Sequence, residues 1–94
     1  EGLTGFQMVD SLCGEHGLTI NAHAWSTAIL TAASLQASFA SANARLLELK
    51  PIPNAALCEL VRVPITHCNG VISRPPGPGL GIEVDEAVVR RLEV

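Results

Sequence analysis

The segment that decides the fold runs from Leu18 to Lys50 and reads LTINAHAWSTAILTAASLQASFASANARLLELK. At its start, residues 18–22 alternate between apolar and polar side chains, which predicts a short β-strand. A stretch rich in Ala and Ser follows and predicts a helix over residues 26–42. Residues 45–50 alternate again and predict a second strand. Two strands joined by one helix form a βαβ unit, in which the strands are parallel and the crossover is right-handed.

Signals for helix ends lie on both sides of the first predicted strand. A helix is predicted over residues 3–16, because Thr4 opens a T-x-x-Q capping box. Gly17 then supplies the residue type that ends a helix at least cost. Ser26 or Thr27 is expected to cap the second helix. The residues expected on the apolar side of that helix are Ile29, Leu30, Ala33, Ala37 and Ala40.

The closing tail, residues 51–94, is predicted to be mostly irregular. Prolines at its start end the second strand, because proline cannot donate a hydrogen bond to a neighbouring strand. One more strand is expected around residues 70–73. Residues 75–81 are rich in Pro and Gly and are predicted to lack regular structure. Asp85 is expected to cap a final helix that ends near Leu92.

The composition is too apolar for a free-standing domain of this size. Of the 94 residues, 48% are hydrophobic and 16% are charged, whereas charged residues make up about 25% of ordinary soluble domains. Parallel sheets are normally covered on both faces, and two strands leave both sheet edges open. Residues 1–94 are therefore interpreted as a single partial domain of the α/β class. We expect the chain by itself to self-associate, as a homo-oligomer, or to be incompletely ordered.

Charge and hydropathy argue against two classes of partner. The net charge is -3 with no basic block, whereas nucleic-acid-binding domains present a basic patch or stripe. Residues 17–44 contain no Asp, Glu, Lys or Arg, but polar side chains such as Asn21 and Gln36 interrupt them. A membrane-spanning helix needs about 20 mainly apolar residues in succession. The sequence therefore predicts neither a nucleic-acid partner nor a membrane partner.

The three cysteines indicate a reducing compartment. An odd number does not fit a disulfide framework, and free thiols are typical of the cytoplasm, which is the expected localisation. Cys58, His67 and Cys68 lie near one another in the sequence, but they lack the paired spacing of a zinc site. The cysteines are better interpreted as small buried apolar side chains.

Two residues carry the candidate chemistry, His23 just after the first predicted strand and Glu48 near the end of the second. Alternation places both on the face opposite the most hydrophobic side chains, and neighbouring strands lie about 4.8 Å apart. A histidine can exchange a proton near neutral pH. Asn21 and Trp25 are candidates to line a substrate pocket beside them. A structural role for His23, and an ion pair between Glu48 and Arg45 or Lys50, remain open.

Four segments form a recognisable series, which in chain order is EGLTG (1–5), NAHAW (21–25), LLELKPIPN (46–54) and NGVISRPPGPGLGIEVDE (69–86). Together they resemble the C-terminal end of the mandelate racemase and muconate lactonizing enzyme family, within the enolase superfamily. The first resembles a turn after the sixth barrel strand, the second the end of the seventh strand, the third the eighth strand, and the last the closing stretch of the family. Their order is more specific than any one of them.

This resemblance implies a fold and an activity. The fold would be the C-terminal fragment of a TIM-like (β/α)-barrel. The activity would be abstraction of a proton beside a carboxylate, with Mg²⁺ stabilising the resulting enediolate, as in racemases and acid-sugar dehydratases. Carried over by position, His23 would be a general acid or base, and Glu48 would hydrogen-bond the enediolate. The implied substrate is a carboxylate-bearing small molecule, either an acid sugar or a hydroxy acid.

The same resemblance implies partners for this segment within a larger protein. The rest of the barrel and a capping domain would complete the site, and the metal-binding carboxylates would lie on other barrel strands. The intact parent is therefore expected to use Mg²⁺, whereas the 94-residue chain alone is expected to hold no catalytic metal and to be inactive. An alternative from another class is a non-catalytic self-association or binding module that reuses this end of the barrel.

Overall fold

A computed structural model describes residues 2–93, so Glu1, the first residue of the EGLTG motif, lies outside the described residues. The fold is α/β, and the predicted order of helix, strand, helix, strand and a tail with a final helix is confirmed. The elements are α1 (Gly2–Glu15), β1 (Ile20–Ala24), α2 (Ala28–Ala40), β2 (Ala44–Leu49), α3 (Ala55–Cys58) and α4 (Glu86–Leu92).

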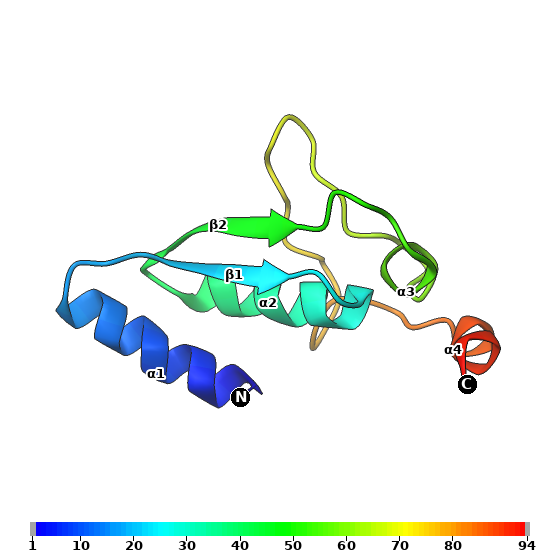
Figure 1. Ribbon diagram of the computed structural model, residues 1–94, viewed down its shortest axis with the longest axis horizontal. Coiled ribbons are helices and arrows are strands. Elements are labelled where there is room, and N and C mark those ends of the chain that lie inside the picture. Colours follow the sequence, from blue (N-terminus) through cyan, green and yellow to red (C-terminus); the bar gives the residue numbers. More distant parts are fainter. Residues whose placement is uncertain (1, 94) are drawn as a thin grey trace.

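The two strands form a parallel sheet, and α2 lies along one of its faces (Figure 1). Small side chains at the contact allow the helix and the sheet to approach closely. The predicted apolar side of α2 is wrong, since Ile29 and Leu30 are 39% and 41% exposed. The face that packs on the sheet differs from the predicted one, because docking against the strands decides which side of α2 turns inward. Its buried residues are Ala28, Thr31, Ala32 and Leu35.

The junction between α1 and β1 explains why the first strand begins later than predicted. Gly17 adopts φ +65° and ends the helix as expected. The Leu18 amide donates to the Cys13 carbonyl at 2.8 Å, which is the long hydrogen bond of a Schellman motif. Leu18 thus belongs to the helix end, and the strand starts at Ile20 rather than at residue 18. The predicted Thr4 cap is wrong, since α1 begins at Gly2 and contains Thr4.

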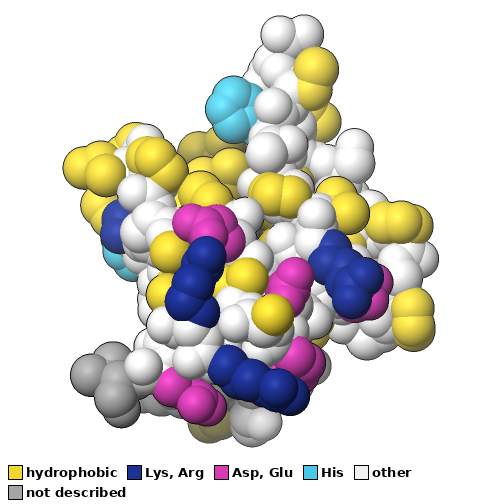
Figure 2. Space-filling view, turned by 90° about the vertical axis from the view of Figure 1, so that its right-hand side faces the viewer, with side chains coloured by type: hydrophobic (Ala, Val, Ile, Leu, Met, Phe, Trp, Pro, Cys, Tyr) yellow, Lys and Arg dark blue, Asp and Glu magenta, His cyan; other side chains and the backbone are white. Residues whose placement is uncertain are grey.

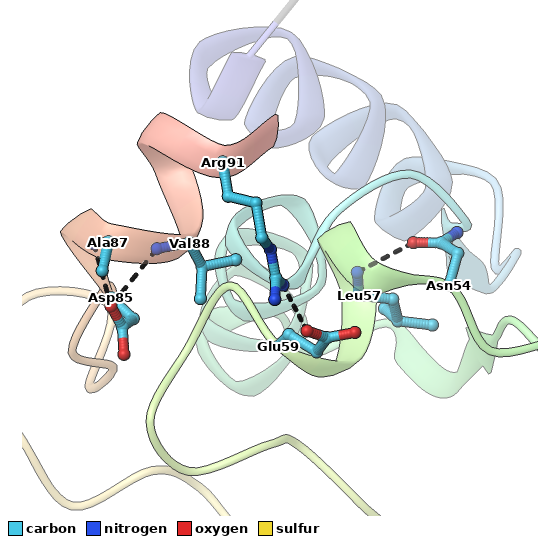
Figure 3. A network of polar contacts seen from close by, with 7 residues as sticks. All are labelled: Asn54, Leu57, Glu59, Asp85, Ala87, Val88 and Arg91. Atoms are coloured by element: carbon cyan, nitrogen blue, oxygen red, sulfur yellow. Dashed lines mark hydrogen bonds and ion pairs between the residues drawn. The ribbon is translucent and has the colours of Figure 1, made fainter. Parts of the chain in front are cut away.

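The closing tail folds back against the start of α2. Leu60 and Val61 are buried together with Ala28, and Val61 forms an antiparallel bridge with Val84. Figure 3 shows the polar contacts of this region: Asn54 and Asp85 cap α3 and α4, and Arg91 of α4 pairs with Glu59 at the end of α3. The Asp85 carboxylate accepts hydrogen bonds from the first amides of α4, so the predicted cap and the predicted end of this helix are confirmed. The partly buried residues packed on the cluster are Ile82, Val84, Val88 and Val89.

The strand expected around residues 70–73 is wrong, because the chain makes a tight turn there. Cys68 and Val71 form a single antiparallel bridge. Between them, Asn69 and Gly70 both have positive φ, at 51° and 78°, which is the geometry of a type I′ turn. The expected burial of the cysteines is also wrong for two of them, since Cys58 and Cys68 are exposed.

The surface and the helix lengths bear on the expected partners. On the face drawn in Figure 2, Lys and Arg side chains lie among Asp and Glu side chains rather than in one positive stripe. Ion pairs join Arg62 to Glu83 and Arg91 to Glu59. Within residues 2–93, none of the helices is long and apolar enough to cross a bilayer.

Candidate active-site residues

His23 and Glu48 are direct partners across the parallel sheet. The strand register pairs them, and the imidazole Nδ1 lies 2.7 Å from Glu48 Oε2. Their side chains are 62% and 53% exposed, on the face opposite α2. The prediction that both lie at corresponding positions of adjacent parallel strands is therefore confirmed. Glu48 pairs with His23 and not with Arg45, which instead donates to the carbonyls of Ala42 and Ala44.

The contact between His23 and Glu48 limits what each side chain can do. If Glu48 is ionised, it can only accept a hydrogen bond, and a neutral His23 ring then carries its hydrogen on Nδ1. The other ring nitrogen, Nε2, then carries a lone pair that can take a proton. Within the described part of the chain, hydrogen bonding to this ring involves Nδ1 only. The arrangement can therefore act as a general base at Nε2, oriented by a carboxylate at Nδ1.

Trp25 packs on the ring of His23. The two rings are stacked with their centroids 4.7 Å apart and their planes 28° from parallel. Trp25 is 43% exposed, so part of the indole also faces the open side of the sheet. Stacking restricts rotation of the imidazole and covers one of its faces. The pocket-lining role predicted for Trp25 stays a prediction, and its observed contact is with His23.

The side chain of Asn21 contacts the neighbouring strand, and the pocket-lining role predicted for it stays a prediction. Its side-chain oxygen accepts a hydrogen bond from the Leu46 amide at 3.1 Å, where the pairing of the two strands becomes irregular. Sequence reasoning identified Asn21 by its alternation with His23 but missed this contact. A signal was available, because Asn is depleted in strand interiors and its presence there indicates a specific polar contact.

His23 and Glu48 lie on an exposed face of the sheet. A hollow of about 720 Å³ lies within the closing tail, where its lining includes Arg62, His67 and Arg74. The residues that the structure describes contain no cluster of three or more His, Cys, Asp or Glu side chains that could hold a metal ion. Mg²⁺ prefers an octahedral set of oxygen ligands, and one carboxylate already bonded to an imidazole does not fit that requirement.

The fold and this pair define an α/β segment with a histidine and a glutamate side by side on parallel strands. The chain belongs to the enolase superfamily, since the family described as "Enolase C-terminal domain-like" matches residues 1–88. The resemblance inferred from the sequence is thereby confirmed.

A curated relative adds a named enzyme to this assignment. The chain is 34% identical over 92 residues to the D-galactarolactone cycloisomerase of Agrobacterium fabrum (strain C58 / ATCC 33970). The match covers 89% of the chain and 24% of that enzyme, so the chain spans about a quarter of the length of this relative. No solved structure matches the chain.

Proposed function

We propose that this chain is the C-terminal part of a barrel enzyme that abstracts a proton from the carbon beside a substrate carboxylate. The observation that carries the proposal is the contact of His23 Nδ1 with Glu48 Oε2 at 2.7 Å. In the proposed step, Nε2 of His23 takes the proton, and the electron pair of the broken C–H bond stays on the substrate as an enediolate. A protein base positioned in this way typically contributes about 10²–10⁴ in rate.

Glu48 can serve this step in two ways at once. One carboxyl oxygen, Oε2, accepts from His23 Nδ1, while the other oxygen remains available to a substrate. If that second oxygen carries a proton, it donates a hydrogen bond to a developing enediolate oxygen, as the resemblance to the mandelate racemase family implies. A proton on that second oxygen leaves Oε2 able to accept from His23 Nδ1, so both contacts can be made together.

The substrate class proposed is a carboxylate-bearing acid sugar or hydroxy acid, and the reaction is of the racemase or dehydratase type. The printed name of the relative supports an acid-sugar substrate, because it is an enzyme that isomerises D-galactarolactone. Mg²⁺ is proposed for the intact enzyme, with ligands outside this chain, since the described residues do not fit a magnesium site. When bound, it would stabilise negative charge on the substrate.

The test replaces His23 with Asn in the intact enzyme. We expect turnover to fall by about 10²–10⁴, and NMR to show loss of solvent-deuterium exchange at the carbon beside the carboxylate for at least one substrate enantiomer. In a dehydratase in which His23 acts as the acid, exchange survives while elimination stops. The matched control is His16→Asn, an exposed histidine at the end of α1. Unchanged exchange and turnover in the His23 variant would make that residue structural.

A second candidate function is a non-catalytic association module. The observation that favours it is the exposure of large apolar side chains on several elements, including Met8 at 66% and Leu46 at 69%. The mass of the intact parent protein separates the two candidates. A parent near the 9.9 kDa of this chain would favour the module, whereas a parent of full barrel size, about 250 residues or more, would favour the enzyme.

A further inference from the structure

We propose that Asn21 is a positioning residue, whose side chain holds an irregularity of β2 and thereby sets Glu48 opposite His23. The effect of Asn21 on catalysis rests on the proposed function. Its effect on the position of Glu48 depends only on contacts within this chain. Asn21 acts through the backbone of β2 and needs no contact with substrate.

The pairing of the strands shows why an irregularity is needed. Ile20 pairs with Ala44, and a regular continuation of that register would put Leu47 opposite His23. The observed partner of His23 is Glu48, so β2 contains one extra residue after Ala44. A one-residue change of register turns every later side chain to the other face of a sheet. The extra residue therefore determines that Glu48 lies on the face of His23 and away from α2.

The extra residue is a β-bulge, a device that re-aims side chains beside active sites and leaves a backbone group outside the ladder. Here the Leu46 amide lies in the irregular stretch and donates to Asn21 Oδ1 at 3.1 Å. Asn21 lies on the neighbouring strand, two residues before His23 and on the same face. The strand that carries the histidine thus also supplies the acceptor that holds the bulge. Without this acceptor the bulge is weakened, and a regular register competes with it.

Two histidines of this chain provide a local readout. His23 Nδ1 lies 2.7 Å from Glu48 Oε2, and with the carboxyl oxygen as acceptor the neutral His23 ring has its hydrogen on Nδ1. His67 has the opposite arrangement, because its Nδ1 accepts from the Gly70 amide at 3.3 Å and its hydrogen therefore lies on Nε2. Nitrogen chemical shifts distinguish the two tautomers. His67 lies in the closing tail, outside the two strands, and its own hydrogen bond to Gly70 sets its tautomer, so it serves as an internal reference in the same spectrum.

The experiment compares the 94-residue chain with Asn21→Val and Asn21→Asp by ¹⁵N NMR of the histidine rings and by amide hydrogen exchange. Valine suits a strand but offers no acceptor, whereas aspartate keeps an oxygen at the same position. We expect wild type and Asn21→Asp to show the Nδ1–H tautomer at His23 and a protected Leu46 amide. Asn21→Val should lose both features while His67 keeps its Nε2–H signature.

Three results would overturn the inference: an Nε2–H tautomer at His23 in wild type, an Nδ1–H tautomer that persists in Asn21→Val, or loss of that tautomer in Asn21→Asp. If Asn21→Val also changes the His67 signal, the variant has unfolded, and Asn21→Asp together with Leu46 exchange in wild type decides the outcome. These readouts need no catalysis. An inactive parent enzyme would thus refute the proposed function and leave the role of Asn21 standing. An unchanged His23 tautomer in Asn21→Val would refute the role of Asn21 and leave the proposed function standing.

Discussion

Asp10 of α1 and Asn43, which precedes β2, are joined by two hydrogen bonds across 33 positions of sequence. Asn43 Nδ2 donates to the Asp10 carbonyl at 3.0 Å and to Asp10 Oδ1 at 2.9 Å. The Ser41 hydroxyl donates to the same carboxylate at 2.5 Å and accepts from the Ala44 amide. These contacts attach the otherwise exposed helix α1 to the point where β2 begins.

Replacement of Asn43 with Ala should therefore destabilise the chain. The substitution removes both hydrogen bonds from Asn43 to Asp10 and leaves the partly buried Asp10 carboxylate with fewer donors, which costs about 1–3 kcal/mol in the free energy of unfolding. Urea denaturation measures this change. Ser11→Ala, an exposed substitution on the same helix, is the control and should change stability by less than about 0.5 kcal/mol. Equal effects of the two variants would show that the Asp10–Asn43 contact adds nothing to stability.

Removal of the Thr31 hydroxyl should destabilise the chain, whereas removal of the Ser38 hydroxyl on the same helix should stabilise it. Thr31 is 1% exposed, and its hydroxyl is within hydrogen-bond distance of the carbonyls of Ala24 and Thr27 at 3.2 and 3.1 Å. It ties the helix to the end of β1, next to Trp25. Thr31→Val keeps the shape but removes the donor, so we expect a loss of about 1–2 kcal/mol.

Ser38 supplies the matched opposite case on the same helix. Its buried Oγ has no hydrogen-bond partner among the described residues, and an unsatisfied buried polar group is itself a cost. Alanine is also the better helix former. Ser38→Ala should therefore stabilise the chain by about 0.5–2 kcal/mol. Thermal unfolding of both variants, followed by circular dichroism, checks the prediction, and destabilisation by Ser38→Ala would refute it.

Local signals were sufficient where one residue decides an element. Thr27 and Asp85 cap their helices as predicted, because each side-chain oxygen accepts from nearby amides whatever the rest of the fold does. Alternation placed His23 and Glu48 on one face correctly, because the two strands pair in regular register from Ala22 and Leu47 onward, after the bulge. The turn at Asn69–Gly70 could also have been predicted, since Asn-Gly is a strong hairpin signal.

Other features depend on contacts between distant segments, and local patterns do not contain them. The bulge follows from the distance between the Asn21 side chain and the Leu46 amide, which no period in the sequence encodes. The side of α2 that packs inward follows from its docking on the sheet, where Thr31 rather than Ile29 meets β1. The packing of Leu60 and Val61 on Ala28 likewise arises only when the tail folds back.

The open face of the sheet should drive self-association. Leu46 is 69% exposed beside His23 and Glu48, and apolar surface of this kind on a two-stranded sheet favours pairing between copies. We expect the apparent mass in size-exclusion chromatography to rise with concentration, and Leu46→Lys to reduce that rise. The control is Val63→Lys in the closing tail, where the side chain is 79% exposed. Equal effects of the two lysine variants would place the association elsewhere.

Two glycines of the closing tail, Gly79 and Gly81, separate the cost of a positive φ from the cost of a steric clash. Gly79 and Gly81 both have positive φ, at 61° and 75°, where an alanine costs about 1–2 kcal/mol. A Cβ on Gly79 would meet nothing within 4 Å, whereas one on Gly81 would lie 2.6 Å from Pro75 Cβ and 2.9 Å from the Pro75 carbonyl oxygen. Gly79→Ala should therefore show the conformational cost alone.

Gly81→Ala should show that cost together with displacement of the Pro75 backbone. Ile82 and Val84, which pack on the cluster of Leu60 and Val61, follow directly, so the strain is passed to the contact that holds the tail. We expect Gly81→Ala to lower the unfolding midpoint in urea clearly more than Gly79→Ala, and to speed exchange of the Arg62 amide, which donates to the Glu83 carbonyl. Equal midpoints would mean that the tail shifts freely at Pro75 and does not depend on this close approach.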